Sequence, residues 1–284
     1  MDDRPNLWIA AQRDFARARM KAFWTELVAS MTGQSTNLLR FEEVQQRLRL
    51  YGQRNLGLQN IPLDKIIGTV GRYHDFTRTF MPRKSVNEDR WKQISALARG
   101  EKGFPPIEVY KVGDAYFVID GNHRVSVARQ LGQPTIEAYV TEIPTSIPFD
   151  ETVTDEELTL KQAYAEFLQH TKLDVLRPTS NVELTEPGMY RQIIQHIDVH
   201  KYFMGLDQQR DISWPEAVVS WYDNVYMPMM EAIRKCNLLE EFPNRTEADL
   251  YVWLIRHQTI LRDQLGGEWR SPEETAKDFM EKLD

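Results

Sequence analysis

Five consecutive segments between residues 107 and 143 constrain the fold more than any other feature of this sequence. In chain order they predict a strand IEVYKV (107–112), a Gly113-Asp114 turn, a strand AYFVID (115–120), a helix at 122–131 closed by Gly132, and a strand TIEAYVTEI (135–143). The three strand segments are rich in β-branched and aromatic residues, and a Gly-Asp pair tolerates the positive φ of a tight hairpin. A glycine directly after an apolar-periodic run is typical of a helix C-terminus. The pattern predicts an α+β fold built around a small mixed β/α domain.

The junction between the second of these strands and the helix reads Asp120-Gly121-Asn122-His123-Arg124. The first turn of a helix presents backbone N–H groups without intrahelical partners and the positive end of the helix dipole, so it stabilises an anion. Gly121 lets a ligand approach the backbone closely. The imidazole and the guanidinium add side-chain donors, and the planar fork of arginine suits phosphate oxygens. The junction therefore predicts a phosphate-binding site.

Asp120 cannot attract phosphate by its charge. It could hold a Mg²⁺ ion, orient His123 or accept a proton from a substrate hydroxyl. The alternative is structural: Asp120 caps the helix, and His123 and Arg124 are ordinary surface residues.

The loop GRYHDFTRTFMPRKS (71–85) provides a second group of cations. These are Arg72, Arg78, Arg83 and Lys84. Four cations could balance a diphosphate or triphosphate, and Tyr73 or Phe76 could stack on a base. The alternative is a solvated basic loop that packs against an acidic surface elsewhere in the chain.

Charge is distributed unevenly along the 284 residues. Residues 1–132 hold 21 Lys and Arg against 14 Asp and Glu, whereas residues 133–284 hold 14 against 28. A basic first half suits a phosphate-bearing ligand, but the acidic second half repels polyanions, so DNA is an unlikely partner. No run approaches the about 18 apolar residues of a membrane span, and the opening residues lack a signal sequence. We expect a soluble, cytoplasmic protein without membrane contact.

The rest of the chain predicts mostly helices. Helical periodicity is present at 6–31, 40–51 and 87–99, NIPLDKIIGTV (60–70) is β-rich, and the proline-containing PTSIPFD (144–150) indicates a domain boundary. We therefore expect a helical segment at 1–58, a nucleotide-binding domain at 59–149 and a helical domain at 150–284.

Two capping boxes mark helix starts in the second half, Thr154 with Glu157 and Thr246 with Asp249. The second begins a helix that we expect to end at Gly266. Its apolar face includes His257, which we interpret as a satisfied core or interface histidine.

The segment from Pro106 to Gly132, and more loosely Ile61 to Tyr73, resembles the ParB/sulfiredoxin-like superfamily, which contains the ParB N-terminal domain, sulfiredoxin and the free-serine kinases. The resemblance covers about 60 to 143, roughly 30% of the chain. It implies a ParB/sulfiredoxin-like domain preceded by helices and followed by a mainly helical domain. The segment EEFPNRTEADLYVWLIRH (240–257) looks like bacterial proteins of the DUF4032 kind, which implies no activity.

The resemblance also implies roles for the junction. The sulfiredoxin turn ends Cys-His-Arg, with the histidine and arginine facing nucleotide phosphates, which points to His123 and Arg124; Asn122 replaces the reactive cysteine, so sulfinic acid reduction is not expected. The serine kinases carry Asp-Gly-His-His-Arg, which matches this chain except at Asn122. In ParB the comparable turn is Gly-Glu-Arg-Arg and binds the triphosphate of CTP.

Three hypotheses for function follow. The first is a Mg²⁺-dependent nucleotide hydrolase or phosphotransferase that binds ATP, ADP or CTP. It assigns catalysis to Asp120, His123 and Glu108, with Asp75 as a further candidate base. It assigns a metal to Asp120. The residues assigned to nucleotide binding are Gly121, Asn122, His123, Arg124, Arg72, Tyr73, Arg78 and Arg83.

The second hypothesis is a non-catalytic module in which the nucleotide gates a protein partner or a homodimer formed through the C-terminal helices. The third, a ParB-like DNA-associated protein, is disfavoured by the acidic charge.

Overall fold

The computed structural model describes the chain except residues 1–3, 33–34, 101–102, 265–266, 268 and 283–284. The chain divides into two compact units, Met1–Thr154 and Asp155–Asp284, each described here by itself. The structure combines a mixed sheet with helices, so the predicted α+β class is confirmed.

The first unit is built on a six-stranded mixed sheet. Its strands are β1 (Leu39–Arg40), β2 (Arg54–Pro62), β3 (Ile66–Thr69), β4 (Ile107–Val112), β5 (Ala115–Asp120) and β6 (Thr135–Ile143). They lie in the order β1-β3-β5-β4-β6-β2. The β4/β5 and β2/β6 pairs are antiparallel and the other neighbours are parallel, so β5 ends beside β3 and the loop that follows β3.

The predicted 107–143 pattern is present in the sheet. β4 and β5 form the hairpin, Gly113 has φ of +54° in the turn, and Gly132 follows the helix with φ of +72°. The bounds of β4, β5 and β6 agree with those expected from the sequence.

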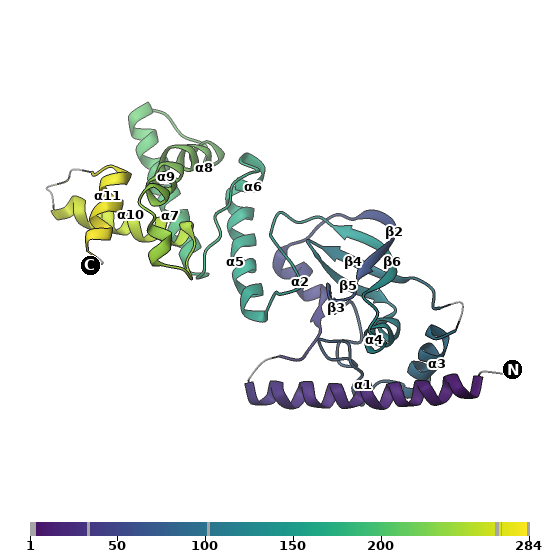
Figure 1. The fold of residues 1–284 in the computed structure, drawn as a ribbon. Coiled ribbons are helices and arrows are strands. Elements are labelled where there is room, and N and C mark those ends of the chain that lie inside the picture. The colour runs from purple at the N-terminus through teal and green to yellow at the C-terminus, as the bar shows by residue number, and fades with distance from the viewer. Residues whose placement is uncertain (1–3, 33–34, 101–102, 265–266, 268, 283–284) are drawn as a thin grey trace. The chain divides into compact units, whose positions relative to one another are not determined.

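The described residues of the first unit include four helices, whose arrangement around the sheet can be followed in Figure 1. They are α1 (Arg4–Thr32), α2 (Phe41–Leu48), α3 (Glu88–Ala98) and α4 (Asn122–Gln130). A single core cluster joins apolar residues of α1, α3 and α4 to the inner face of the sheet, with Phe15, Trp91 and Val118 among them. Trp91 is fully buried, and its indole N–H donates to Ser126 Oγ at 2.9 Å, which fixes α3 against α4.

The structure differs from the expectations in two places. β2 begins at Arg54 rather than near residue 60, because it is an edge strand whose first residues are exposed and lack an apolar alternation. Residues 1–58 and 59–149 lie in one compact unit, since Phe15 and other α1 residues complete the core beneath the sheet.

The described residues of the second unit form helices. They are α5 (Asp155–Thr171), α6 (Leu173–Leu176), α7 (Met189–Gln208), α8 (Trp214–Trp221), a π-helix (Tyr222–Tyr226), α9 (Met227–Lys235), a 3₁₀ helix (Leu238–Glu241), α10 (Glu247–Gln264) and α11 (Pro272–Glu281). The Thr246–Asp249 capping box is formed at the start of α10, whereas Gly266 lies outside the described residues. His257 Nε2 lies 2.7 Å from Asp278 Oδ2, so this histidine is satisfied.

Within the described parts of the chain, none of the helices combines the length and the apolar character needed to cross a membrane.

Candidate functional site

A pocket of about 200 Å³ lies at the N-terminus of α4, where β5 ends. The whole 120–124 junction lines it, together with Gly71 and Arg72 from the loop after β3 and Arg90 from α3. The structure therefore brings together six of the residues assigned to the site from the sequence. Arg90 was not among them.

Gly121 shapes the entrance to α4. It has φ of +111° and ψ of 17°, a left-handed conformation that disfavours any side chain. A Cβ atom at this position would meet Ile107 Cγ2 at 2.4 Å and Arg124 Nε at 3.1 Å. The glycine is thus required both for the turn and for the close packing of the junction on β4.

The first turn of α4 contains buried polar atoms without partners. Asn122 and His123 are 7% and 5% exposed. Asn122 Oδ1 and both ring nitrogens of His123 have no hydrogen-bond partner among the described residues. Such groups are uncommon in folded proteins, because an unmade hydrogen bond costs about 1–3 kcal/mol. They are concentrated where the helix N-terminus also leaves backbone N–H groups free.

His123 is uncharged at neutral pH. The pKa of this imidazole is lowered from 6.5 to about 4, mainly by burial and then by the positive charges of Arg90 and Arg72, while Asp75 acts in the opposite direction. Its ring meets Phe76 edge-on, with 5.4 Å between centroids. The neutral ring can donate one N–H to a ligand oxygen but is a weak proton acceptor.

Two exposed cations, Arg72 and Arg90, also line the pocket. Arg72 has φ of +59°, and its guanidinium lies 3.7 Å from Asp75. The buried Thr69 holds the turn before it, since its hydroxyl accepts the Gly71 N–H at 3.2 Å. Arg90 is placed by the packing of its neighbour Trp91 on α4. No local sequence signal distinguishes Arg90, because its role depends on the contact between two helices.

The side chain of Arg124 lines the pocket and is also fixed by hydrogen bonds to neighbouring residues. Its guanidinium donates to the carbonyl oxygen of Pro105 at 2.9 Å and to that of Pro106 at 2.5 Å. It also forms an ion pair with Asp120, the predicted metal ligand. No group of three or more His, Cys, Asp or Glu side chains in the described ranges could hold a metal ion. These residues do not fit a protein-held Mg²⁺ site, because a metal at Asp120 would compete with Arg124.

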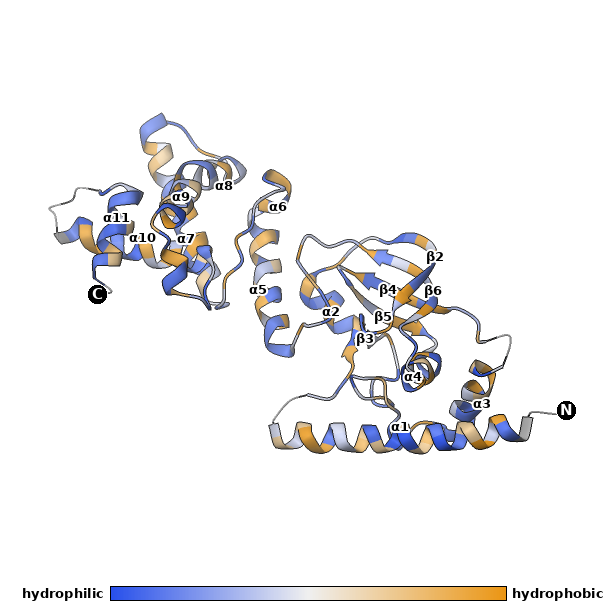
Figure 2. Cartoon of the chain, in the orientation of Figure 1, coloured by the Kyte–Doolittle hydropathy of each residue, from blue (hydrophilic) through white to orange (hydrophobic). Residues whose placement is uncertain are grey.

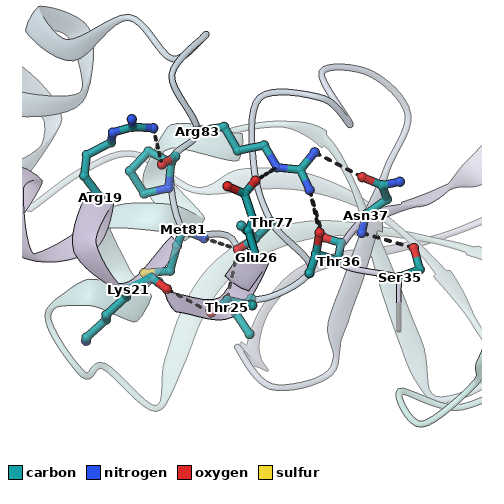
Figure 3. A network of polar contacts seen from close by, with 12 residues as sticks. Arg19, Lys21, Thr25, Glu26, Ser35, Thr36, Asn37, Thr77, Met81 and Arg83 are labelled. Carbon is teal, nitrogen blue, oxygen red and sulfur yellow. Dashed lines mark hydrogen bonds and ion pairs between the residues drawn. The ribbon is translucent and has the colours of Figure 1, made fainter. Parts of the chain in front are cut away.

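Arg78 and Arg83 lie away from the pocket and make structural contacts. Figure 3 shows Arg83 pointing at Glu26 and Asn37: Nε lies 2.8 Å from the carboxylate of Glu26, and Nη1 donates to Asn37 Oδ1 at 3.0 Å. Arg78 donates to the carbonyl oxygen of Val153. The two guanidiniums tie the loop to α1 and to the end of the first unit.

The aromatic residues expected to stack on a base are engaged elsewhere. Phe76 is fully buried in the core. Tyr73 lies under the guanidinium of Arg40, 4.6 Å from the ring centroid, and contacts His74 at 4.2 Å. Neither ring lines the pocket.

The two predicted general bases are also outside the pocket lining. Glu108 lies on β4 opposite Asp120 in the strand register and is exposed. Asp75 is paired with Arg72. The pocket thus presents hydrogen-bond donors and positive charge, with no free carboxylate in its wall.

Comparisons with known proteins found one family model and several solved structures. The family model described as the ParB N-terminal domain matches residues 53–149. Sulfiredoxin from Arabidopsis thaliana is 24% identical, with 29% of this chain and 82% of that chain covered and a TM-score of 0.22. The C-terminally truncated chromosome-partitioning protein ParB from Caulobacter crescentus, complexed with CTP-γ-S, is 14% identical, with 79% and 99% covered and a TM-score of 0.23. No curated protein matches.

The predicted resemblance of the second half to DUF4032 proteins is not confirmed by these comparisons and stays a prediction. The resemblance predicted for about residues 60 to 143 is confirmed: residues 53–149, which include the 120–124 junction, match the model of the ParB N-terminal domain.

Proposed function

We propose that the pocket at the N-terminus of α4 binds the phosphate groups of a nucleotide. The observation that carries this proposal is the set of buried, unpartnered atoms on Asn122 and His123. A phosphate seated at the helix N-terminus would accept from the free backbone N–H groups and from the imidazole N–H. Its binding would relieve an energetic cost that the free protein bears.

The charges around the pocket support the same ligand class. Arg72 and Arg90 face His123 closely enough to lower its pKa, so the pocket is electropositive before any ligand enters. Arg124 adds a third guanidinium, which its bonds to Pro105 and Pro106 hold in place. Arginines fixed in this way lose little side-chain entropy when they bind phosphate.

Binding without catalysis is the function that this geometry favours. Phosphoryl transfer needs a positioned base and neutralisation of charge at the transferred group. Here Asp120 is ion-paired, and Glu108 and Asp75 lie outside the lining. We therefore favour a nucleotide-binding module over the predicted hydrolase or phosphotransferase.

Isothermal titration calorimetry of the full chain with ATP, CTP and inorganic triphosphate tests this proposal. Binding of all three would assign recognition to the phosphates, and a preference among the nucleotides would identify the base. We expect Arg90→Gln to weaken binding about tenfold to a hundredfold, since hydrogen bonds to charged groups contribute about 1.5–3 kcal/mol.

Lys84→Gln is the matched control, because Lys84 is an exposed cation that lies six residues before Arg90 in the sequence and outside the pocket. Equal losses in the two variants would show that the contribution is only long-range charge. Absence of any binding at millimolar ligand would refute the proposal. Release of phosphate by the wild-type protein, lost in His123→Gln, would restore the enzyme hypothesis.

A further inference from the structure

The outward face of α1 carries an apolar surface that nothing in the first unit covers. Six large side chains lie at the helical spacing i, i+3, i+4, i+7, i+8 and i+11, and each is 39–80% exposed. They are Met20, Phe23, Trp24, Leu27, Val28 and Met31, called here the α1 outer face. Hydrophobic residues are spread along the whole of this helix in Figure 2.

The opposite face of α1 is already packed. Ala11, Phe15, Ala18 and Ala22 are buried against the first unit, and Asp14 accepts from the Arg99 guanidinium at 2.6 Å. A helix that is apolar on two faces is normally enclosed on both sides. The outer face therefore lacks a partner among the described residues of the first unit.

We propose that the α1 outer face is a homodimer interface, in which α1 of one copy packs antiparallel against α1 of a second copy. A two-fold interface must be self-complementary, since each contact occurs twice. The spacing of the six positions meets this condition: reversal of the helix places the first on the last, the second on the fifth and the third on the fourth. All of these pairs are apolar.

The size of the face fits a dimer. At these exposed fractions each large apolar side chain exposes on the order of 100 Å² to solvent, so the six together expose roughly 600 Å². This area is at the upper end of the range for the largest apolar patch on a monomeric protein. Two copies would bury roughly 1,200 Å² in total, the lower limit of specific interfaces at about 1,200–2,000 Å².

The charges favour the antiparallel orientation. The exposed cations Arg17 and Lys21 lie at the N-terminal end of the outer face, and this end would meet the C-terminus of the partner helix. The negative end of a helix dipole attracts cations. A parallel pair would instead bring the cations of the two copies together.

A lipid surface is the competing occupant. Helices that lie in a membrane interface usually carry Lys or Arg along the polar border of the apolar face. On one border of the outer face, Arg19 donates to the carbonyl oxygen of Pro82 at 3.1 Å and Glu26 pairs with Arg83, so this border offers no unpaired cation (Figure 3). The other border carries the exposed cations Arg17 and Lys21, which line a groove of about 780 Å³ between Trp24 and Met81. This groove gives room for side chains of a second copy.

Sedimentation equilibrium of the full chain tests the proposal. We expect a dimer at micromolar concentration for the wild-type protein and a monomer for Phe23→Asp with Leu27→Asp. Phe203→Asp with Leu206→Asp on α7 is the matched control, since Phe203 and Phe23 are similarly exposed at 54% and 56% and α7 belongs to the other unit. Circular dichroism melts verify that each variant is folded.

Three outcomes would overturn the proposal: a monomeric wild type, a dimer that survives the α1 substitutions, or a dimer lost only in the α7 variant. The antiparallel orientation is tested by cross-linking with introduced cysteines. Cys236, the one cysteine of the sequence, is replaced in these variants by serine so that it cannot form the cross-link. Phe23→Cys combined with Val28→Cys should give a disulfide-linked dimer on oxidation, whereas Phe23→Cys alone should not, because only a parallel pair would bring residue 23 of the two copies together. A monomer that sediments with vesicles of phosphatidylserine and phosphatidylcholine, and no longer does so after the α1 substitutions, would assign the face to lipid.

Discussion

His123 is the residue on which the candidate site depends. It is nearly fully buried, packs on Phe76 and has no polar partner for either ring nitrogen within the described structure. A core histidine without function is normally satisfied, as His257 is by Asp278. Unlike His257, His123 thus keeps both ring nitrogens available to a ligand.

The titration of His123 should report on its cationic neighbours. Its pKa is lowered to about 4, first by burial and then by Arg90. Arg90→Gln should raise this pKa, because a positive charge near the imidazolium is removed. NMR titration of the His123 ring measures the shift, with Lys84→Gln as control. An unchanged pKa in Arg90→Gln would mean that Arg90 does not face the ring.

The stability of the first unit should depend on the protonation of His123. Between pH 6.5 and 4 the unfolded chain binds a proton that the folded state excludes. The contribution of His123 to the free energy of unfolding is therefore fully present above pH 6.5 and is lost as the pH falls towards 4. The loss is about 3 kcal/mol at most. Urea unfolding followed by NMR signals of the sheet should show a flatter pH profile in His123→Gln. His196→Gln, which removes a buried histidine of the other unit, should leave this profile unchanged.

Gly121→Ala should disturb the site more than a glycine substitution elsewhere. Its Cβ would lie 2.4 Å from Ile107 Cγ2 at a positive φ, so β4 or the turn must move. Gly132→Ala is the control: it has a positive φ but no atom within 4 Å of the new methyl group. We expect a loss of about 1 kcal/mol for Gly132→Ala and about 2–4 kcal/mol for Gly121→Ala, measured by urea denaturation. Equal losses would show that only the backbone conformation matters.

At the scale of elements, the start of α10 is fixed by a buried carboxylate. Asp249 is fully buried and accepts from the Thr246 N–H at 2.9 Å and from the Thr185 N–H at 3.0 Å. The same side chain thus completes a capping box and fastens the segment before α7. The capping box of α11, formed by Ser271 and Glu274, is exposed and does only the first of these.

Asp249→Ala should therefore destabilise the second unit by about 2–4 kcal/mol, because two part-buried N–H groups lose their acceptor. Ser271→Ala should cost about 1 kcal/mol, the usual value for an exposed cap. Thermal unfolding of the two variants compares them. A loss in Ser271→Ala as large as that in Asp249→Ala would contradict the assigned roles.

At the scale of the whole molecule, the boundary between the units lies at Thr154 rather than at residue 149. Val153 is 1% exposed, and its carbonyl oxygen accepts from Arg78, so the chain after Phe149 is part of the first unit. The proline-rich composition of 144–150 indicates an irregular segment, but it does not show which side the segment packs on.

A fragment of residues 1–154 should fold by itself, since it contains the complete sheet and its core. A fragment of residues 1–149 should be less stable by about 1.5–3 kcal/mol, the value of burying one valine side chain. Urea denaturation of the two fragments measures the difference. Equal stabilities would place the boundary where the sequence predicts it.

The sequence by itself determined the local elements around the site. The strands and the helix of 107–143 were predictable because turn glycines, β-branched runs and helix ends act over a few residues, and the position of Gly121 at the start of α4 followed from the same rules. Only the tertiary structure decided which cations belong to the site. Arg90 joins it because Trp91 bonds to Ser126, 35 residues away, and Arg83 leaves it because its partner Thr36 is 47 residues away. Side-chain partnerships over such separations depend on the packing of the whole unit, and a local pattern does not contain them.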